Sequence, residues 1–284
     1  MRPSRPTAAA GALGLALIAG GCGQKTLTVV DSCPDGGILS GSGSCVPPTL
    51  FDDLIGWWQL DDGTGSMVAR DSSTRGNDGT LVSLDPASAW SAGRSGSGLA
   101  VEGNGFVNVP DSTSLDTITE QITIAGWGYL EGTINDYATI ASREDGTGID
   151  QHYHISINSR GEVPAMWLKT DTGTNTLLQG TTAVTRQAWI HIAGTYDGST
   201  ARLYVDGQEV ESLALTGLFV TDNTPFILGG NGNGVGDANV TERFPGRIDE
   251  IMLYRRALSA AEIAQLYAGA LFPAGSVADG GARD

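Results

Sequence analysis

Cationic, sulfur-containing and imidazole side chains are scarce in this sequence. Its 284 residues include 16 Lys and Arg against 32 Asp and Glu, a formal net charge of −16, and only three Cys and three His. So acidic a chain is a poor candidate for sequence-independent binding to nucleic acid, which needs a basic surface. We therefore expect no nucleic-acid partner, and we expect carboxylates to be available to a divalent cation.

Long apolar runs are also missing, except for a short one at the N-terminus. Residues 1–21 begin with Arg2 and Arg5, continue with an apolar run over 8–18 and end in small residues. This three-part layout is typical of a secretory signal peptide, and the run is too short for a comfortable membrane span. Nothing later in the chain resembles a transmembrane segment, so we expect export.

The signal ends in "IAGGC", which resembles the lipobox of bacterial lipoproteins, with Cys22 as the lipidated residue. The departure from that pattern is Ala19, which stands where Leu is usual, and ordinary signal cleavage is the alternative. Loss of residues 1–21 removes two Arg and no acid, so the mature charge would be −16 − 2 = −18. Gly23 after the lipidated Cys favours, by analogy, the outer membrane over the inner one.

Two Cys remain after the signal, in the Gly-rich stretch "CPDGGILSGSGSC". An exported pair of this kind predicts a local disulfide between Cys33 and Cys45, and a metal site built from two Cys is the alternative. Residues 22–52 as a whole are polar and Gly-rich, which indicates a flexible tether between a lipid anchor and a folded domain.

From residue 53 onward, short apolar segments alternate with turn residues. The segments expected as strands are 54–60, 98–103, 106–110, 121–130, 137–143, 152–158, 163–169, 188–196, 201–213, 225–230 and 246–254. About a dozen strands without intervening helices indicate an all-β sandwich or barrel.

Three local patterns refine this picture. Asp206-Gly207 predicts a tight hairpin within 201–213, and 188–196 is apolar in both phases, so both of its sides need cover. In "LSAAEIAQLYA", Ser259 and Glu262 predict a capping box at the start of a C-terminal helix. The tail at 269–284 is polar and is expected to be disordered.

Six ordered motifs together resemble the LamG-like jelly-roll domains of the concanavalin A-like lectin/glucanase superfamily. They are "LIGWWQLDDGTG", "ARDSSTRGNDGTL", "FVNVPDSTSLD", "ITIAGWGY", "WIHIAGTYDGSTARLYVDGQEV" and "GRIDEIMLYRRALSAAEIAQLY". The resemblance covers residues 53–268 and implies a two-sheet antiparallel jelly-roll sandwich with one short C-terminal helix. The superfamily includes glycan-binding modules, structural domains and glycosidases, so the fold alone does not decide the function.

The signatures of hydrolytic catalysis are absent. A glycosidase needs two facing carboxylates, and we find no Glu-x-Asp-x-Glu pattern or its bulged form. The adjacent pairs Glu144-Asp145 and Asp249-Glu250 are expected to point to opposite faces of their strands. We also find no HExxH, no GxSxG and no free Cys in the mature body, so we predict no catalytic residues and no enzyme activity.

One strand carries a polar stripe backed by apolar residues. In "QHYHISINS", His152 and His154 share one face with the next polar residues, while the intervening residues face the core. Trp167 on the following strand and Arg143 before it complete a candidate ligand-binding set, because sugars are held by aromatic rings and planar hydrogen-bonding groups. A solvated strand face is the alternative, and zinc binding by the two His lacks a third ligand. His191, in contrast, is expected to be a buried structural ring.

Calcium is the expected cofactor. Asp71 and Asn77 crowd a glycine-containing loop that offers the oxygen ligands calcium prefers, although ordinary turn chemistry accounts for the same residues. The resemblance adds Asp249 of the final strand, because many relatives hold a structural calcium between an early loop and that strand.

The leading functional hypothesis is a surface-tethered, non-catalytic binding or adhesion module for a polysaccharide or glycoconjugate. A structural or protein-interaction lipoprotein without a glycan ligand is the alternative, and an enzyme of undetected mechanism comes third.

Overall fold

The computed structural model describes residues 38–39, 45–46, 48–101, 103, 105–144, 151–173, 175–232 and 240–271. Cys22 and Cys33 lie outside these residues, and of Cys45 only the backbone is described, in β2. The signal peptide, the lipidation and the disulfide therefore stay predictions, as does a disordered tail from residue 272 onward. At its first residues the predicted disorder is wrong, because Ala270 and Leu271 pack in a buried apolar cluster.

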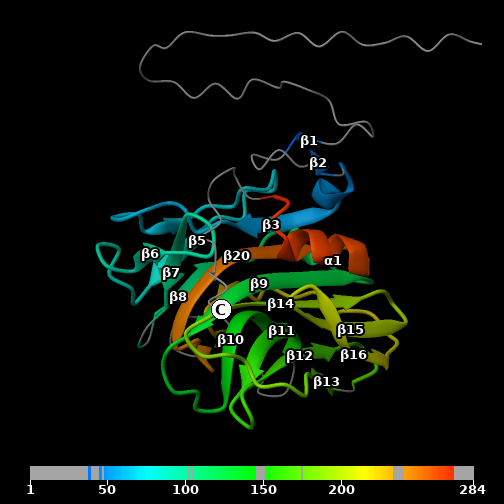
Figure 1. The fold of residues 1–284 in the computed structure, drawn as a ribbon. Helices are drawn as coiled ribbons and strands as arrows, with labels where there is room; N and C mark the ends of the chain where they lie inside the picture. Colours follow the sequence, from blue (N-terminus) through cyan, green and yellow to red (C-terminus); the bar gives the residue numbers. More distant parts are fainter. Residues whose placement is uncertain are drawn as a thin grey trace, which may run out of the picture. The chain divides into compact units, whose positions relative to one another are not determined.

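Most of the body belongs to two antiparallel sheets (Figure 1). The first, called the β11 sheet here, has the strand order β13-β12-β11-β10-β17-β8-β5-β4. Its strands are β4 (Val68–Ala69), β5 (Gly79–Val82), β8 (Phe106–Val109), β10 (Tyr137–Glu144), β11 (Gln151–Asn158), β12 (Val163–Lys169), β13 (Asn175–Gln179) and β17 (Phe226–Leu228).

The second, called the β9 sheet, has the order β16-β15-β14-β9-β20-β7-β6, and β3 pairs with β20 beside β7. Its strands are β3 (Leu54–Trp58), β6 (Trp90–Ala92), β7 (Ser97–Ala100), β9 (Ile122–Leu130), β14 (Trp189–Tyr196), β15 (Thr200–Val205), β16 (Gln208–Ala214) and β20 (Gly246–Tyr254). Short elements outside the two sheets are β1 (Ile38–Leu39), β2 (Cys45–Val46), β18 (Asn231–Gly232), β19 (Val240–Thr241) and the 3₁₀ turns η1 (Pro48–Phe51) and η2 (Leu115–Thr117).

The core lies between the facing sides of the two sheets. One buried cluster joins apolar side chains of both sheets, for example Ile155 and Met166 of the β11 sheet with Ile124 and Ile192 of the β9 sheet. Each contributes alternate residues of its strand, as the period of two requires. The predicted two-sheet antiparallel sandwich is confirmed.

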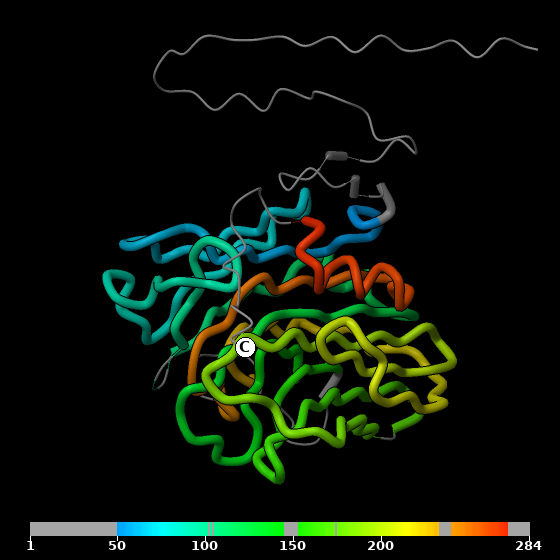
Figure 2. The backbone as a smooth tube through the Cα atoms, viewed as in Figure 1, coloured from blue at the N-terminus to red at the C-terminus, as the bar shows by residue number. Residues whose placement is uncertain are grey.

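A third layer covers the outer side of the β9 sheet. Helix α1 (Ala260–Tyr267) lies across β9, β14 and β20 (Figures 1 and 2), and its Ile263 and Leu266 pack with Trp127, Ala193 and other outward-facing residues. Strand β14 is therefore covered on both sides, which explains its apolar residues in both phases. The capping box of Ser259 and Glu262 is present as predicted.

The predicted strands agree with the observed ones within a few residues, and Asp206 and Gly207 form the expected tight turn, both at positive φ. Four strands of the two sheets were missed, namely β4, β5, β6 and β13. Residues 68–69 and 90–92 are very short strands, most of the segment before residue 80 was placed in a loop, and 175–179 carry only two leucines. Within the described residues, no helix has the length and apolar character needed to cross a bilayer.

Candidate ligand-binding site

The outer side of the β11 sheet, opposite the core, carries a row of polar and aromatic side chains. Antiparallel register places His154 of β11 between Ser142 of β10 and Trp167 of β12. Tyr153, Ile155 and Ile157 alternate with this row and face the core, so the alternation predicted for this strand is confirmed. We call this row and its neighbours Tyr137, Ser156 and Asn158 the polar face.

His154 is buried within the polar face. Only 1% of the residue is exposed, and its ring lies 6.1 Å from the Tyr137 ring and 6.2 Å from the Trp167 ring between centroids. Burial lowers the pKa of His154 to about 3, so the imidazole is neutral at physiological pH and offers one donor and one acceptor. The alternative of a solvated strand face is thus wrong at His154.

Several buried polar atoms of this region have no partner within the part of the chain that the structure describes. They include both ring nitrogens of His154, the Ser156 hydroxyl and the amide oxygen of Asn231. Buried polar groups are normally hydrogen-bonded, because each unpaired one costs about 1–3 kcal/mol. The other described residues with such atoms include His191 and Glu250 of the β9 sheet, so a cavity beside this face, rather than the unpaired atoms alone, marks it as a candidate site.

Strands β18 and β19 and the residues next to them, Gly230 and Glu242, border the polar face. The Ser142 hydroxyl donates to the Gly230 carbonyl oxygen at 2.9 Å, and the Asn231 amide donates to Glu242 Oε2 at 3.0 Å. Burial raises the pKa of the Glu242 carboxyl, and Glu242 has a left-handed φ of 45°. Such a backbone costs a non-glycine residue energy and is concentrated at functional sites.

A cavity of about 600 Å³ adjoins this region. Tyr137 and Glu242 belong both to its lining and to the polar face or its border, and Asn135, Asp136 and Arg243 are other polar lining residues. The cavity is of the size that small-molecule sites have in proteins. The polar face and the cavity together form the candidate site.

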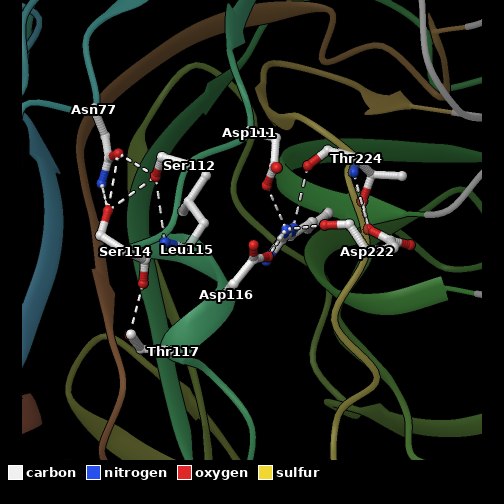
Figure 3. Close-up of polar contacts among 10 residues, drawn as sticks. Asn77, Asp111, Ser112, Ser114, Leu115, Asp116, Thr117, Asp222 and Thr224 are labelled. Atoms are coloured by element: carbon white, nitrogen blue, oxygen red, sulfur yellow. Dashed lines mark hydrogen bonds and ion pairs between the residues drawn. The ribbon is translucent and has the colours of Figure 1, made fainter.

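Arg143 does not belong to this site, contrary to the sequence-based prediction. It pairs with Tyr153 in register, on the core side, and is only 3% exposed. Its Nη2 contacts carboxylate oxygens of Asp111 and Asp116 at 2.8 Å each and the Asp222 carbonyl oxygen at 2.9 Å (Figure 3). Its Nε donates to the Thr224 carbonyl oxygen.

Arg143 is therefore a buried cation that connects two loop segments, 111–116 and 222–224, to β10. Sequence reasoning missed this because a β-bulge between Thr139 and Ala141 shifts the alternation of β10 by one residue, which turns Arg143 to the core side. The acids that neutralise it also come from distant loops. Of the other predicted residues, Trp167 is half-buried on the polar face, and the side chain of His152 lies outside the described residues.

The predicted calcium residues fall into two separate networks. The Asp71 carboxylate accepts hydrogen bonds from the backbone nitrogens of Trp57, Ser73 and Asn77 and from the Ser73 hydroxyl. Asn77 is buried. Its amide contacts the hydroxyls of Ser112 and Ser114 (Figure 3) and donates to the Ile55 carbonyl oxygen. Turn chemistry and packing thus account for this loop.

Asp249 is held instead by the loop between β6 and β7. Its Oδ2 accepts from the backbone nitrogens of Arg94 and Ser95, at 2.7 and 3.0 Å. Burial raises the pKa of Asp249 and of Glu250 well above their usual values, and Asp61 adds to both shifts. The acids near Asp249 are therefore Glu250 and Asp61, and Asp61 was missed although "LDDG" follows the first strand.

The expectation that Asp249 and Glu250 point to opposite faces is wrong. A β-bulge interrupts β20 between Asp249 and Met252, Glu250 has a φ of 50°, and the indole of Trp57 donates to Glu250 at 2.6 Å. The bulge brings both acids into one electrostatic cluster. Nevertheless, the described residues contain no group of three or more His, Cys, Asp or Glu that could hold a metal ion. Calcium binding stays a prediction.

His191 is a buried structural ring, as expected. It lies on the outer side of the β9 sheet, 5.2 Å from Trp127 and 6.2 Å from Tyr267 of α1 between ring centroids. Burial lowers its pKa to about 3, and Arg94 contributes.

Comparison with solved structures shows the same sandwich in many proteins. Domain 4 of a family 43 extracellular arabinanase from Geobacillus stearothermophilus, in complex with arabinotriose, superposes with a TM-score of 0.57 at 20% identity, over 76% of this chain and 98% of that one. A Ruminococcus gnavus sialidase carbohydrate-binding module of family 40, bound to α2,3-sialyllactose, gives 0.51 at 21%, over 60% and 96%. The receptor-binding domain of a botulinum neurotoxin C/D mosaic gives 0.56 at 15%, over 77% and 52%.

At these identities the structures establish the fold and nothing finer. No curated protein matches the sequence. A family model described as the concanavalin A-like lectin/glucanases superfamily, of the third laminin G type, matches residues 101–264, more than half of the chain. The chain therefore belongs to the concanavalin A-like lectin/glucanase superfamily.

Proposed function

We propose that the chain is a non-catalytic binding module and that a glycan binds at the polar face and its adjoining cavity. The observation that carries the proposal is the cavity of about 600 Å³ lined by Asn135, Asp136, Tyr137 and Glu242, next to the half-buried ring of Trp167. A polyhydroxylated ligand supplies both donors and acceptors, so it can bond to these polar side chains where an apolar ligand cannot.

The surrounding side chains suit a saccharide. Trp167 and Tyr137 present rings at 81° with centroids 6.0 Å apart, and the apolar face of a sugar ring packs on such aromatic surfaces. Asn135, Asp136 and Glu242 supply oxygens that accept hydrogen bonds from sugar hydroxyls. Similar folds in the arabinanase domain and the sialidase module hold arabinotriose and sialyllactose, which supports a glycan as the ligand class.

A glycan array tests this proposal. The purified chain, with calcium present, is expected to bind at least one class of oligosaccharide. Substitution Trp167→Ala is expected to remove that signal, whereas Met67→Ala is the matched control, because Met67 is a 45% exposed apolar residue outside the candidate site. Absence of binding to every glycan would contradict the proposal.

Protein interaction is the second candidate, and the edge strand β16 favours it. All seven residues of β16 are exposed, including Val210 and Leu213, and among the described strands β16 pairs with β15 alone. Exposed strand edges are templates for pairing with another chain. A silent glycan array together with loss of a protein partner on Val210→Lys substitution would favour this function.

The proposal includes a lipid anchor at Cys22, which would hold the module at a bacterial membrane, with the outer membrane favoured. We expect Cys22→Ser to move the protein from the detergent-soluble membrane fraction to the aqueous one. If the unsubstituted protein is already aqueous, simple secretion replaces the anchor.

A further inference from the structure

We infer that Arg243 is a carboxylate-binding residue and that the glycan held by this module carries a carboxylate group. This inference rests on the proposed function and specifies the chemical class of the ligand. Four of the described arginines, Arg75, Arg94, Arg160 and Arg243, have no carboxylate within 4 Å among the described residues, and of these only Arg243 lines the cavity of the candidate site.

Most described arginines have a carboxylate within 4 Å. Those with an ion pair are Arg70, Arg143, Arg186, Arg202, Arg247, Arg255 and Arg256. Arg243 forms no such pair with any residue that the structure describes, and its Nη1 is buried without a hydrogen-bond partner. A guanidinium stays charged at all physiological pH values. A buried N–H group of it that has no hydrogen-bond acceptor therefore lowers the stability of the folded state.

The guanidinium is held in place by an aromatic ring. Its Cζ lies 5.0 Å from the centroid of Phe106, which forms a small apolar cluster with Ile227 and Val240 on the outer side of the β11 sheet. Stacking on an aromatic face fixes the plane of a guanidinium and leaves its edge for planar, bidentate partners such as carboxylates. The apolar base lowers the local dielectric, which strengthens a charge-assisted hydrogen bond.

The cavity beside Arg243 has charges of both signs. Asp136 contributes to the raised pKa of Glu242, so these two acids lie near each other, whereas burial alone lowers the pKa of Arg243. The lining therefore has an acidic part at Asp136 and Glu242 and a cationic part at Arg243. A ligand with one carboxylate and several hydroxyls matches both parts, because the acids accept hydrogen bonds from hydroxyls while the guanidinium binds the carboxylate.

The test uses matched pairs of saccharides that differ only in charge. Uronic-acid oligosaccharides and sialosides are compared with their methyl esters, which retain every hydroxyl and lose the negative charge. We expect the purified chain to bind one carboxylated class at least about tenfold more tightly than its ester, the effect of one charge-assisted contact.

Three variants complete the test. Arg243→Gln is expected to lower affinity for the acid to that for the ester, and Arg243→Lys to restore part of the difference because it retains the charge without the planar fork. Arg186→Gln is the control, since Arg186 is paired with Glu162 and lies outside the cavity. Equal binding of acid and ester, unchanged by Arg243→Gln, would overturn this inference and leave the proposed glycan function intact. Failure of every saccharide to bind would overturn both.

Discussion

Single residues in this fold show how burial sets protonation. His191 lies between Trp127 and Tyr267, and burial holds its pKa near 3, below the usual value of 6.5. Between these two values the unfolded chain binds a proton at His191 and the folded chain does not. Acidification through this window therefore favours unfolding, so the stability that depends on the neutral ring is lost as pH falls.

We predict that the stability difference between the unsubstituted protein and His191→Gln depends on pH in this window. The free energy of unfolding of the unsubstituted protein, relative to that of His191→Gln, is expected to fall by about 1.4 kcal/mol per pH unit as pH falls below 6.5. Urea unfolding at pH 7, 6 and 5 measures it. Taking the difference cancels the opposite contribution of Asp249 and Glu250, whose raised pKa values favour the folded state in acid. A difference that does not change with pH would contradict the buried, neutral ring.

The sequence predicts which way His154 points but not what surrounds it. Period-two alternation in "QHYHISINS" places Tyr153 and Ile155 in the core and His154 opposite them, and this is confirmed. The His154 ring lies beside Tyr137 and Trp167 of the two neighbouring strands, and β10 is joined to Gly230 and Glu242 by hydrogen bonds from Ser142 and Thr139. Local pattern holds no information on such contacts between strands. Arg243 was missed for the same reason: nothing near it in the sequence marks Phe106 as its support.

At the scale of elements, long-range polar contacts connect loops to strands. Arg143 joins β10 to Asp111 and Asp116, which lie around η2, and to the loop that carries Asp222 and Thr224 (Figure 3). Removing one partner of a buried ion pair leaves the other charges uncompensated.

We predict that Arg143→Met lowers the free energy of unfolding by about 3–5 kcal/mol. Arg186→Met, which removes the exposed pair with Glu162, is the matched control and should cost less than about 1 kcal/mol. Urea denaturation of both variants measures the two effects. Equal losses of unfolding free energy in the two variants would contradict the prediction that the buried contacts of Arg143 stabilise these loops more than an exposed ion pair does.

Sequence patterns predict whole elements well where the rule is local. The capping box of Ser259 and Glu262 and the Asp206-Gly207 turn depend on contacts within four residues, and both are present. The β-bulge at Glu250 is different, because it is set by the pairing of β20 with β9, and it reversed the expected direction of an acidic side chain. The alternation of residues within one strand reveals neither which strands pair nor where bulges occur. For this reason strand patterns alone do not predict which side chains meet in a site.

At the scale of the whole molecule, the acidic composition leaves calcium as an open prediction. Asp249 is buried beside Asp61 and Glu250, whereas Asp71 is saturated by protein donors. We expect that calcium at a hundredfold excess over its Kd stabilises the fold by about 2.7 kcal/mol, and that EDTA reverses this.

Two variants locate the effect. Asp249→Asn should abolish the calcium-dependent shift of the melting temperature, and Asp71→Asn should retain it even though its baseline stability is lower. Unchanged melting with EDTA and with calcium, and no metal in the purified protein, would leave Asp249 as a purely structural acid.

The central claim is that a glycan binds at the polar face of the β11 sheet and its cavity, and an NMR titration with an array-positive oligosaccharide tests it most directly. The account predicts that the largest side-chain shifts occur at Trp167 and His154, and that Trp167→Ala weakens binding at least about tenfold, as loss of a central aromatic contact does. Shifts confined to β16 or to the outer side of the β9 sheet, with His154 and Trp167 unchanged, would contradict it.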